Sequence, residues 1–179
     1  MKVFFIIPHG HYSGAAKQLY LLARGLPRER FKVRVCVLGK NGFFGDIVQR
    51  SDLPIEALGW TRILDPQPLW RLRRMVRDYD PDLIHGWSLF TLPVIQLVGN
   101  GRRIFLSNPI PSAKRKPHFD RLNRWLVKRV ERILVNTPSE GRQCRRLGMA
   151  ADKIEWVPPS VEPHPVLDID PLSLLRSLS

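Results

Sequence analysis

The segment HGHYSGAAKQL, which follows the first apolar run of the chain, has the composition of a phosphate-binding loop. Gly10 and Gly14 would let the backbone come close to a ligand, and a helix that begins after Ser13 would present free N–H groups to an anion. We therefore expect these three residues to bind phosphate. The alternative is that Gly14 only permits tight packing of a helix on a sheet, and the sequence leaves both interpretations open.

Two further stretches could supply polar and aromatic contacts. His85 and Trp87, in the run His-Gly-Trp-Ser, would put an imidazole and an indole at the end of a strand, as the wall of a sugar or lipid pocket. The alternative is a buried, hydrogen-bonded histidine with a tryptophan that caps the core, which is the more common situation for such residues taken singly. Ser107 and Asn108 offer amide and hydroxyl groups, or they form a plain surface loop.

No self-contained catalytic or metal-binding motif accompanies these residues. The loop around Gly14 departs from the dinucleotide fingerprint, and Lys17 lacks the neighbours of a phosphate-loop lysine. Carboxylate pairs, nucleophile elbows, zinc motifs and cysteine clusters are missing from the sequence, since Cys36 and Cys144 lie far apart. We assign no catalytic residue, no metal and no cofactor, and a dehydrogenase, hydrolase or metalloenzyme is disfavoured.

The elements that would position these residues alternate between strands and helices. Short β-branched or aromatic runs predict strands at Lys2 to Pro8, Phe31 to Leu38, Pro54 to Leu58, Asp82 to Gly86, Arg103 to Ser107, Arg132 to Asn136 and Lys153 to Val157. Helical patterns lie at Gly14 to Leu26, Pro66 to Tyr79, Phe90 to Val98, His118 to Val130 and Pro138 to Leu147. This order predicts a Rossmann-like, doubly wound, mainly parallel sheet of six or seven strands with helices on both faces.

The candidate residues follow the first, fourth and fifth predicted strands, whose carboxyl ends should share one edge of the sheet. Open α/β sheets bind ligands outside that edge, where the strand order reverses. The almost wholly apolar run KVFFIIP predicts a central strand. The proline-rich stretch after Trp156 reads as a linker, so we expect one domain at 1–165 and a linker with the start of a further domain at 166–179.

The net charge of +13 is unevenly distributed along the chain. Between Gly101 and Met149, thirteen Lys or Arg residues stand against three acids. We expect a basic face that includes Lys114, Arg115, Lys116, Arg121 and Arg124. Such a face attracts nucleic acid, anionic lipid or phosphorylated ligands, but no nucleic-acid motif accompanies it, and a basic helix often simply packs on the sheet and solvates its charges. Sparse cysteines and the absence of a signal-peptide pattern predict a cytoplasmic protein, with peripheral membrane contact as a further expectation.

In this order, three segments resemble the N-terminal domain of GT-B glycosyltransferases, in particular the retaining group called family 4. They are SGAAKQLYLLARGL at residues 13–26, PDLIHGW at 81–87, and RILVNTPSEGRQCRRLGMAADKIEWVPPSVEP at 132–163. The resemblance covers residues 1 to about 165. The chain departs from the family pattern at Ser13 and Ala16, where glycine and an acid are usual, and at Asn108, where family members often have a histidine near the donor sugar.

The resemblance implies an acceptor-binding domain whose partner domain holds most of a nucleotide-sugar. On this basis Ser13, Gly14 and Gly10 would contact the donor phosphates, and His85, Trp87, Ser107, Asn108 and His11 would contact the sugar or a carbohydrate or lipid-linked acceptor. It also implies that the isolated chain completes no transfer. The alternative is a basic Rossmann-like binding module for nucleic acid or anionic membrane.

Overall fold

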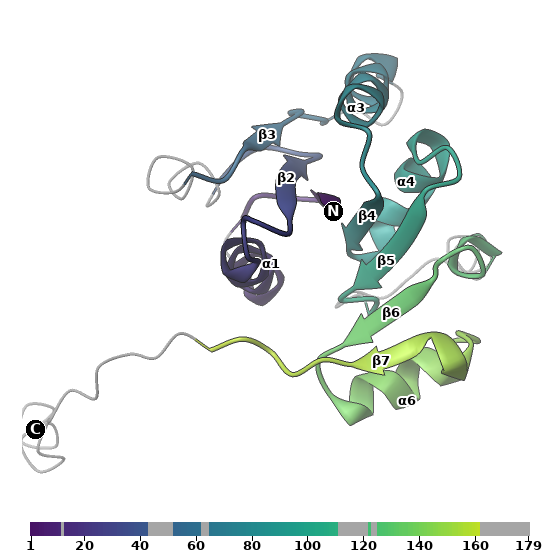
Figure 1. The fold of residues 1–179 in the computed structure, drawn as a ribbon. Helices are drawn as coiled ribbons and strands as arrows, with labels where there is room; N and C mark the ends of the chain where they lie inside the picture. Colours follow the sequence, from purple (N-terminus) through teal and green to yellow (C-terminus); the bar gives the residue numbers. More distant parts are fainter. Residues whose placement is uncertain (12, 43–51, 62–64, 111–121, 123–124, 162–179) are drawn as a thin grey trace, which may run out of the picture.

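The computed structural model describes residues 1–11, 13–42, 52–61, 65–110, 122 and 125–161. Seven parallel strands form one sheet in the order β3-β2-β1-β4-β5-β6-β7 (Figure 1). The strands are β1 Lys2–Ile7, β2 Lys32–Val37, β3 Ile55–Ala57, β4 Leu83–Trp87, β5 Arg103–Ser107, β6 Arg132–Val135 and β7 Ile154–Trp156. The helices whose bounds lie within the described residues are α1 Gly14–Gly25, α3 Pro66–Tyr79, α4 Leu92–Val98 and α6 Pro138–Arg146, with 3-10 turns η1 Leu89–Thr91 and η2 Ala151–Lys153.

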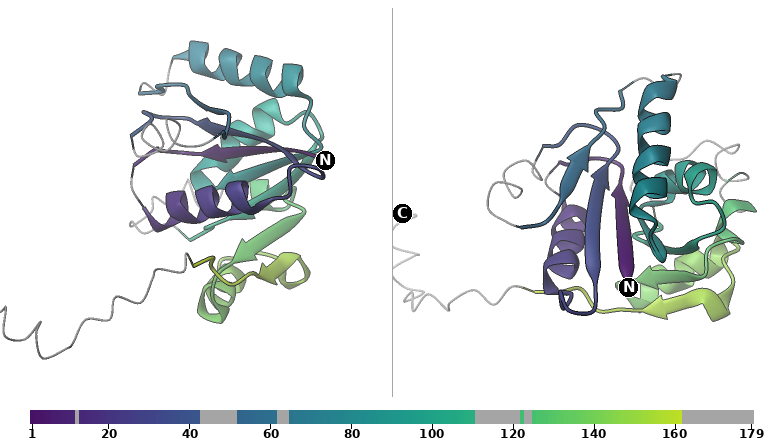
Figure 2. Two further views of the ribbon diagram at one scale, coloured as in Figure 1. Left: turned by 60° about the vertical axis from the view of Figure 1, so that its left-hand side comes forward. Right: turned by 45° about the horizontal axis from the view of Figure 1, so that its top comes forward.

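Strand β1 lies in the middle of the sheet, as its apolar sequence predicts. It pairs with β2 on one side and with β4 on the other. Val3, Phe5 and Ile7 pack on the layer that contains α1, whereas Phe4 and Ile6 pack on the layer that contains α3 and α4. Because both faces of β1 are covered, every residue from Val3 to Ile7 is buried, and the predicted doubly wound fold is confirmed (Figure 2).

Local capping explains where the helices begin and end. The side chain of Ser13 accepts the amide of Ala16 at the start of α1, and that of Asp65 accepts the amide of Gln67 at the start of α3. Asp80 ends α3 in the left-handed conformation. The side chains of Ser13 and Asp65 thus satisfy amides that a helix leaves without internal partners, and the backbone amide of Asp80 donates to the carbonyl of Val76.

The predicted elements agree closely with the structure where it describes them. The helix predicted at Pro66 to Tyr79 has those bounds, whereas the helix predicted at Phe90 to Val98 begins with the 3-10 turn η1. Of the helix predicted at His118 to Val130, the structure describes residues 122 and 125–130, of which 122 and 125–127 are helical. The predicted domain boundary near residue 165 lies outside the described residues.

One polar pair lies inside the apolar core, between β4 and β5. Nε2 of His85 and Oγ of Ser107 are 2.8 Å apart, and both side chains are buried. The rings of Phe5, Trp87 and Phe105 surround the imidazole at centroid distances of 5.3, 5.4 and 6.2 Å. Burial lowers the pKa of His85 to about 3, because the imidazolium would lose its hydration in this position.

We predict that this histidine makes the folded state less stable in mild acid. Below the ordinary histidine pKa of about 6.5 His85 binds a proton in the unfolded chain but not in the folded chain. The contribution of His85 to the free energy of unfolding is therefore full above about pH 6.5 and falls as the pH drops towards 3. The limiting slope is about 1.4 kcal/mol per pH unit. Denaturant unfolding between pH 7 and pH 5 should show this loss, and His85→Gln should remove it. A His85 ring that titrates near pH 6.5 in NMR spectra of the folded chain would contradict the prediction.

Candidate functional site

The strand order reverses between β1 and β4, and a pocket lies where these strands end. The segment after β1 enters α1 on one layer, and the segment after β4 enters α4 on the other, so the two connections diverge at the carboxyl edge of the sheet. The pocket between them has a volume of about 440 Å³. Its lining comprises Ile7, Pro8, His9, Ser13, Gly14, Ala15, Trp87, Ser88, Phe90, Asn108 and Ile110.

The amino end of α1 opens on this pocket. Ser13 accepts the amide of Ala16 at 3.1 Å, and the first intrahelical bond runs from the amide of Lys17 to the carbonyl of Ser13 at 2.9 Å. The amides of Gly14 and Ala15 precede that bond, so α-helix geometry gives them no intrahelical acceptor. With the helix dipole they form a site suited to an anion.

Gly14 faces open space. A Cβ atom built on Gly14 would meet no atom of the described structure within 4 Å. The sequence left open whether Gly14 binds a ligand or only permits tight packing of the helix on the sheet. Tight packing would require a close neighbour of Gly14, and the described structure has none there. The absence of a side chain at Gly14 leaves room in front of the helix for a ligand.

Gly10, by contrast, is a packing residue in this structure and does not line the pocket. Its amide donates to the carbonyl of Lys40 at 3.1 Å, and a Cβ atom at Gly10 would fall 1.7 Å from the carbonyl oxygen of Asn41. Gly10 thus holds the loop after β1 against the loop after β2. His11 is exposed and also lies outside the lining, with its ring 5.9 Å from that of His9, which does line the pocket.

The segment after β4 forms the opposite wall. Trp87, which the sequence places either in a pocket wall or as a cap on the core, lines the pocket, but its side chain packs into the layer of α1 and only 6% of it is exposed. Its Nε1 is buried and has no hydrogen-bond partner among the described residues. Phe90 supplies an exposed aromatic ring at this pocket, and it was not among the predicted site residues although it lies only four residues after the predicted strand end at Gly86.

Ser88 joins Trp87 to the 3-10 turn in a strained conformation, with φ 147° and ψ 149°. Such angles are rare for residues other than glycine and persist only where neighbouring contacts enforce them. Here Ser88 Oγ accepts the amide of Phe90, and the Ser88 carbonyl accepts both the amide and the hydroxyl of Thr91. The strain is thus held at the wall of the pocket.

Two adjacent candidate residues at the end of β5, Ser107 and Asn108, lie in different surroundings. The hydroxyl of Ser107 forms a hydrogen bond with His85 in the core, and neither Ser107 nor His85 lines the pocket. Asn108 does line it and has a left-handed backbone, with φ 50°. The described pocket therefore brings together Ser13, Gly14, Trp87 and Asn108 from the predicted set, and it contains no carboxylate that could act as a base.

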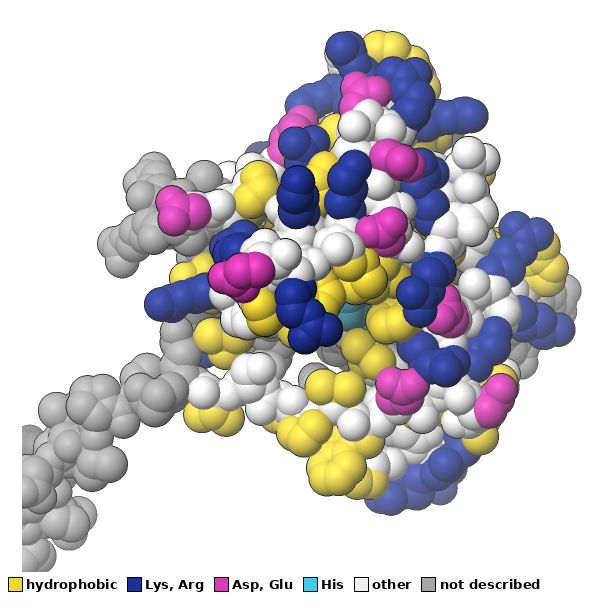
Figure 3. Space-filling view, in the orientation of Figure 1, with side chains coloured by type: hydrophobic (Ala, Val, Ile, Leu, Met, Phe, Trp, Pro, Cys, Tyr) yellow, Lys and Arg dark blue, Asp and Glu magenta, His cyan; other side chains and the backbone are white. Residues whose placement is uncertain are grey.

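Several other expectations concern the surface. The predicted basic-face residues Lys114, Arg115, Lys116, Arg121 and Arg124 lie outside the described residues. In the part that the structure describes, Lys and Arg side chains gather over α3 (Figure 3). No helix of that part is long and apolar enough to span a bilayer, and it contains no cluster of three or more His, Cys, Asp or Glu suited to a metal.

Similar folds occur in solved structures at low sequence identity. Anabaena HepE, solved in complex with UDP and glucose, superimposes with a TM-score of 0.78 at 16% identity over 99% of this chain and 50% of its own. The lipopolysaccharide outer core galactosyltransferase WaaB superimposes with a TM-score of 0.67 at 14% identity, over 94% of this chain and 50% of its own. Acinetobacter baumannii MurG superimposes with a TM-score of 0.60 at 11% identity, over 93% of this chain and 47% of its own.

The chain thus spans about half the length of these three proteins. No curated protein matches it. The Glycosyltransferase Family 4 description matches residues 12–164, which is most of the sequence. Together with the Rossmann-like sheet and the pocket at its reversal point, this match shows that the chain belongs to glycosyltransferase family 4.

Proposed function

We propose that the chain is the acceptor-side half of a retaining glycosyltransferase, which moves a sugar from a nucleoside-diphosphate donor to a carbohydrate or lipid-linked acceptor. The second half of the cleft, and most of the donor contacts, would come from another Rossmann-like domain. The half-length match to HepE, which was solved with UDP-glucose, supports this arrangement. The alternative of a basic binding module rests on net charge alone, and family membership favours the transferase.

The open space at Gly14 is the observation that carries the proposal. It lies directly before the amino end of α1, at the reversal between β1 and β4. A diphosphate oxygen placed there would accept the amides of Gly14 and Ala15 and interact favourably with the helix dipole. The exposed ring of Phe90 and the amide of Asn108 would then face the sugar or the acceptor across the pocket.

In this proposal, catalysis depends on positioning and on electrostatic stabilisation of the departing diphosphate. The amides at the start of α1 would be oriented before the reaction and would strengthen their interaction as negative charge develops on the leaving phosphate. The described pocket lining offers no carboxylate for a protein base, which is consistent with such a mechanism. We assign no individual catalytic residue.

We predict that Gly14→Val in the two-domain enzyme lowers turnover at least about tenfold, because its side chain would occupy the space reserved for the phosphate. The thermal midpoint should stay within about 2 °C of the parent, since the new Cβ meets no described atom. Gly10→Ala is the matched control: its Cβ would collide with the Asn41 carbonyl, so it should lower the midpoint. Unchanged turnover in a folded Gly14→Val enzyme would rule out the phosphate role.

We also predict that purified residues 1–179 neither transfer nor hydrolyse a nucleotide-sugar at a useful rate. Half of the proposed cleft would be missing, so the reacting groups could not be held together. Release of UDP from UDP-glucose is a direct assay, with the two-domain enzyme as the positive control. Turnover that follows the chain through successive purification steps would contradict the prediction.

A further inference from the structure

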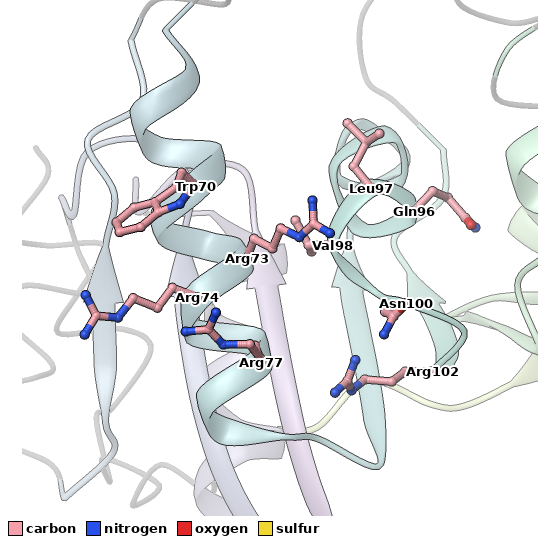
Figure 4. A pocket seen from close by; sticks show the side chains of 9 residues that line it. All are labelled: Trp70, Arg73, Arg74, Arg77, Gln96, Leu97, Val98, Asn100 and Arg102. Atoms are coloured by element: carbon pink, nitrogen blue, oxygen red, sulfur yellow. The ribbon is translucent and has the colours of Figure 1, made fainter.

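A second and larger groove lies between α3 and α4, away from the site described above (Figure 4). Its volume is about 570 Å³. Its lining includes Trp70, Arg73, Arg77, Leu97, Asn100 and Arg102. Arg77 precedes β4, and Asn100 and Arg102 precede β5, so this end of the groove lies near the amino ends of the strands. The pocket at α1 lies at their carboxyl ends.

Positive charge faces this groove from both sides. Arg73 reaches from α3 towards α4, and Arg102 reaches back towards α3 from the start of β5 (Figure 4). Arg77 lies on α3 one turn after Arg73. Among the described residues that line the groove, none is acidic. Arg77 and Arg102 are each paired with a carboxylate, of Asp78 and Asp80 respectively, so Arg73 adds positive charge that no described carboxylate pairs.

The ordinary structural roles of arginine explain only part of this arrangement. Arg77 lies in the last turn of α3, where a cation suits the helix dipole, and its guanidinium pairs with Asp78 at 3.0 Å. Arg102 is held by Asp80 at 2.7 Å and by the carbonyl of Gly99 at 3.2 Å, which fixes its orientation. Among the described acidic side chains, none forms an ion pair with Arg73.

Exposed apolar side chains flank the charged part of the groove. Trp70 on α3 is 63% exposed and Leu97 on α4 is 66% exposed. Large apolar surfaces beside several guanidinium groups suit a ligand that carries an anionic group next to a planar or apolar one. A phosphate fits the charge better than a single carboxylate does, because its double charge and several oxygens can accept from more than one guanidinium.

We propose that the α3–α4 groove is a second anion site, which binds the phosphate group of a ligand through Arg73, Arg77 and Arg102. Arg102 is already oriented by Asp80 and the Gly99 carbonyl, so it contributes a fixed donor. Arg73 reaches towards α4 from α3, and Arg77, one turn further along α3, adds a third guanidinium to the groove lining. The proposal does not depend on the function proposed for the α1 pocket, because the described linings of the two sites share no residue.

The test is an NMR titration of the chain with inorganic pyrophosphate at low ionic strength. The Nε–Hε signals of Arg73, Arg77 and Arg102 report on the groove, and the amides of Gly14 and Ala15 report separately on the α1 pocket. Arg73→Gln combined with Arg77→Gln should weaken binding at the groove about tenfold or more. Arg142→Gln combined with Arg145→Gln, which removes the same charge from exposed positions of α6, should leave it unchanged.

A second arm identifies the source of the phosphate. The parent and the two double variants are sedimented with vesicles of phosphatidylcholine alone or with added phosphatidic acid. Binding to the acidic vesicles that only the groove variant loses would support the proposal with a lipid headgroup as ligand, and a response of the groove to pyrophosphate alone would support it with a soluble phosphate. The proposal is overturned if the groove signals respond to neither probe, or if both double variants lose the same amount of binding.

Discussion

The burial of β1 on both faces is the constraint on which the rest of the structure depends. A strand whose successive side chains are all apolar must be covered by two layers, and the chain achieves this by sending α1 to one layer and α3 and α4 to the other. Covering both layers forces the order of strands to reverse beside β1. That reversal separates the two loops at the carboxyl edge and leaves the pocket between them.

Within the pocket, the backbone conformation rather than charged side chains determines how an anion could be bound. The donors at the start of α1 are amides, and their accessibility follows from the missing side chain at Gly14. Ser88 and Asn108 both have positive φ, at 147° and 50°, and turn the neighbouring segments towards the same space. Such a site needs no ionised side chain to attract a phosphate, since oriented amides and the helix dipole supply the positive potential.

The sequence was sufficient to predict the sheet, because strong apolar runs alternate with well-marked breakers. The run PDLIHGW illustrates both the success and the limit of this approach. Its strand was predicted correctly, but the sequence does not reveal that Trp87 turns into the core while Phe90 remains exposed. From the sequence, Gly10 and Gly14 were equivalent candidates for phosphate binding. The fold distinguishes them, because it brings the carbonyl of Asn41 against Gly10 and leaves Gly14 open. The α3–α4 groove was not predicted from the sequence, because two helices that are separated in the sequence form it together.

The central claim is that the amino end of α1 receives the diphosphate of a nucleotide-sugar. A crystal structure of the proposed two-domain enzyme with a bound nucleoside diphosphate tests it most directly. The account predicts a phosphate oxygen at about 3 Å from the amide nitrogen of Gly14 or Ala15, inside the space that a side chain at Gly14 would fill. A diphosphate bound entirely by the other domain, with that space occupied by protein or by solvent alone, would contradict it.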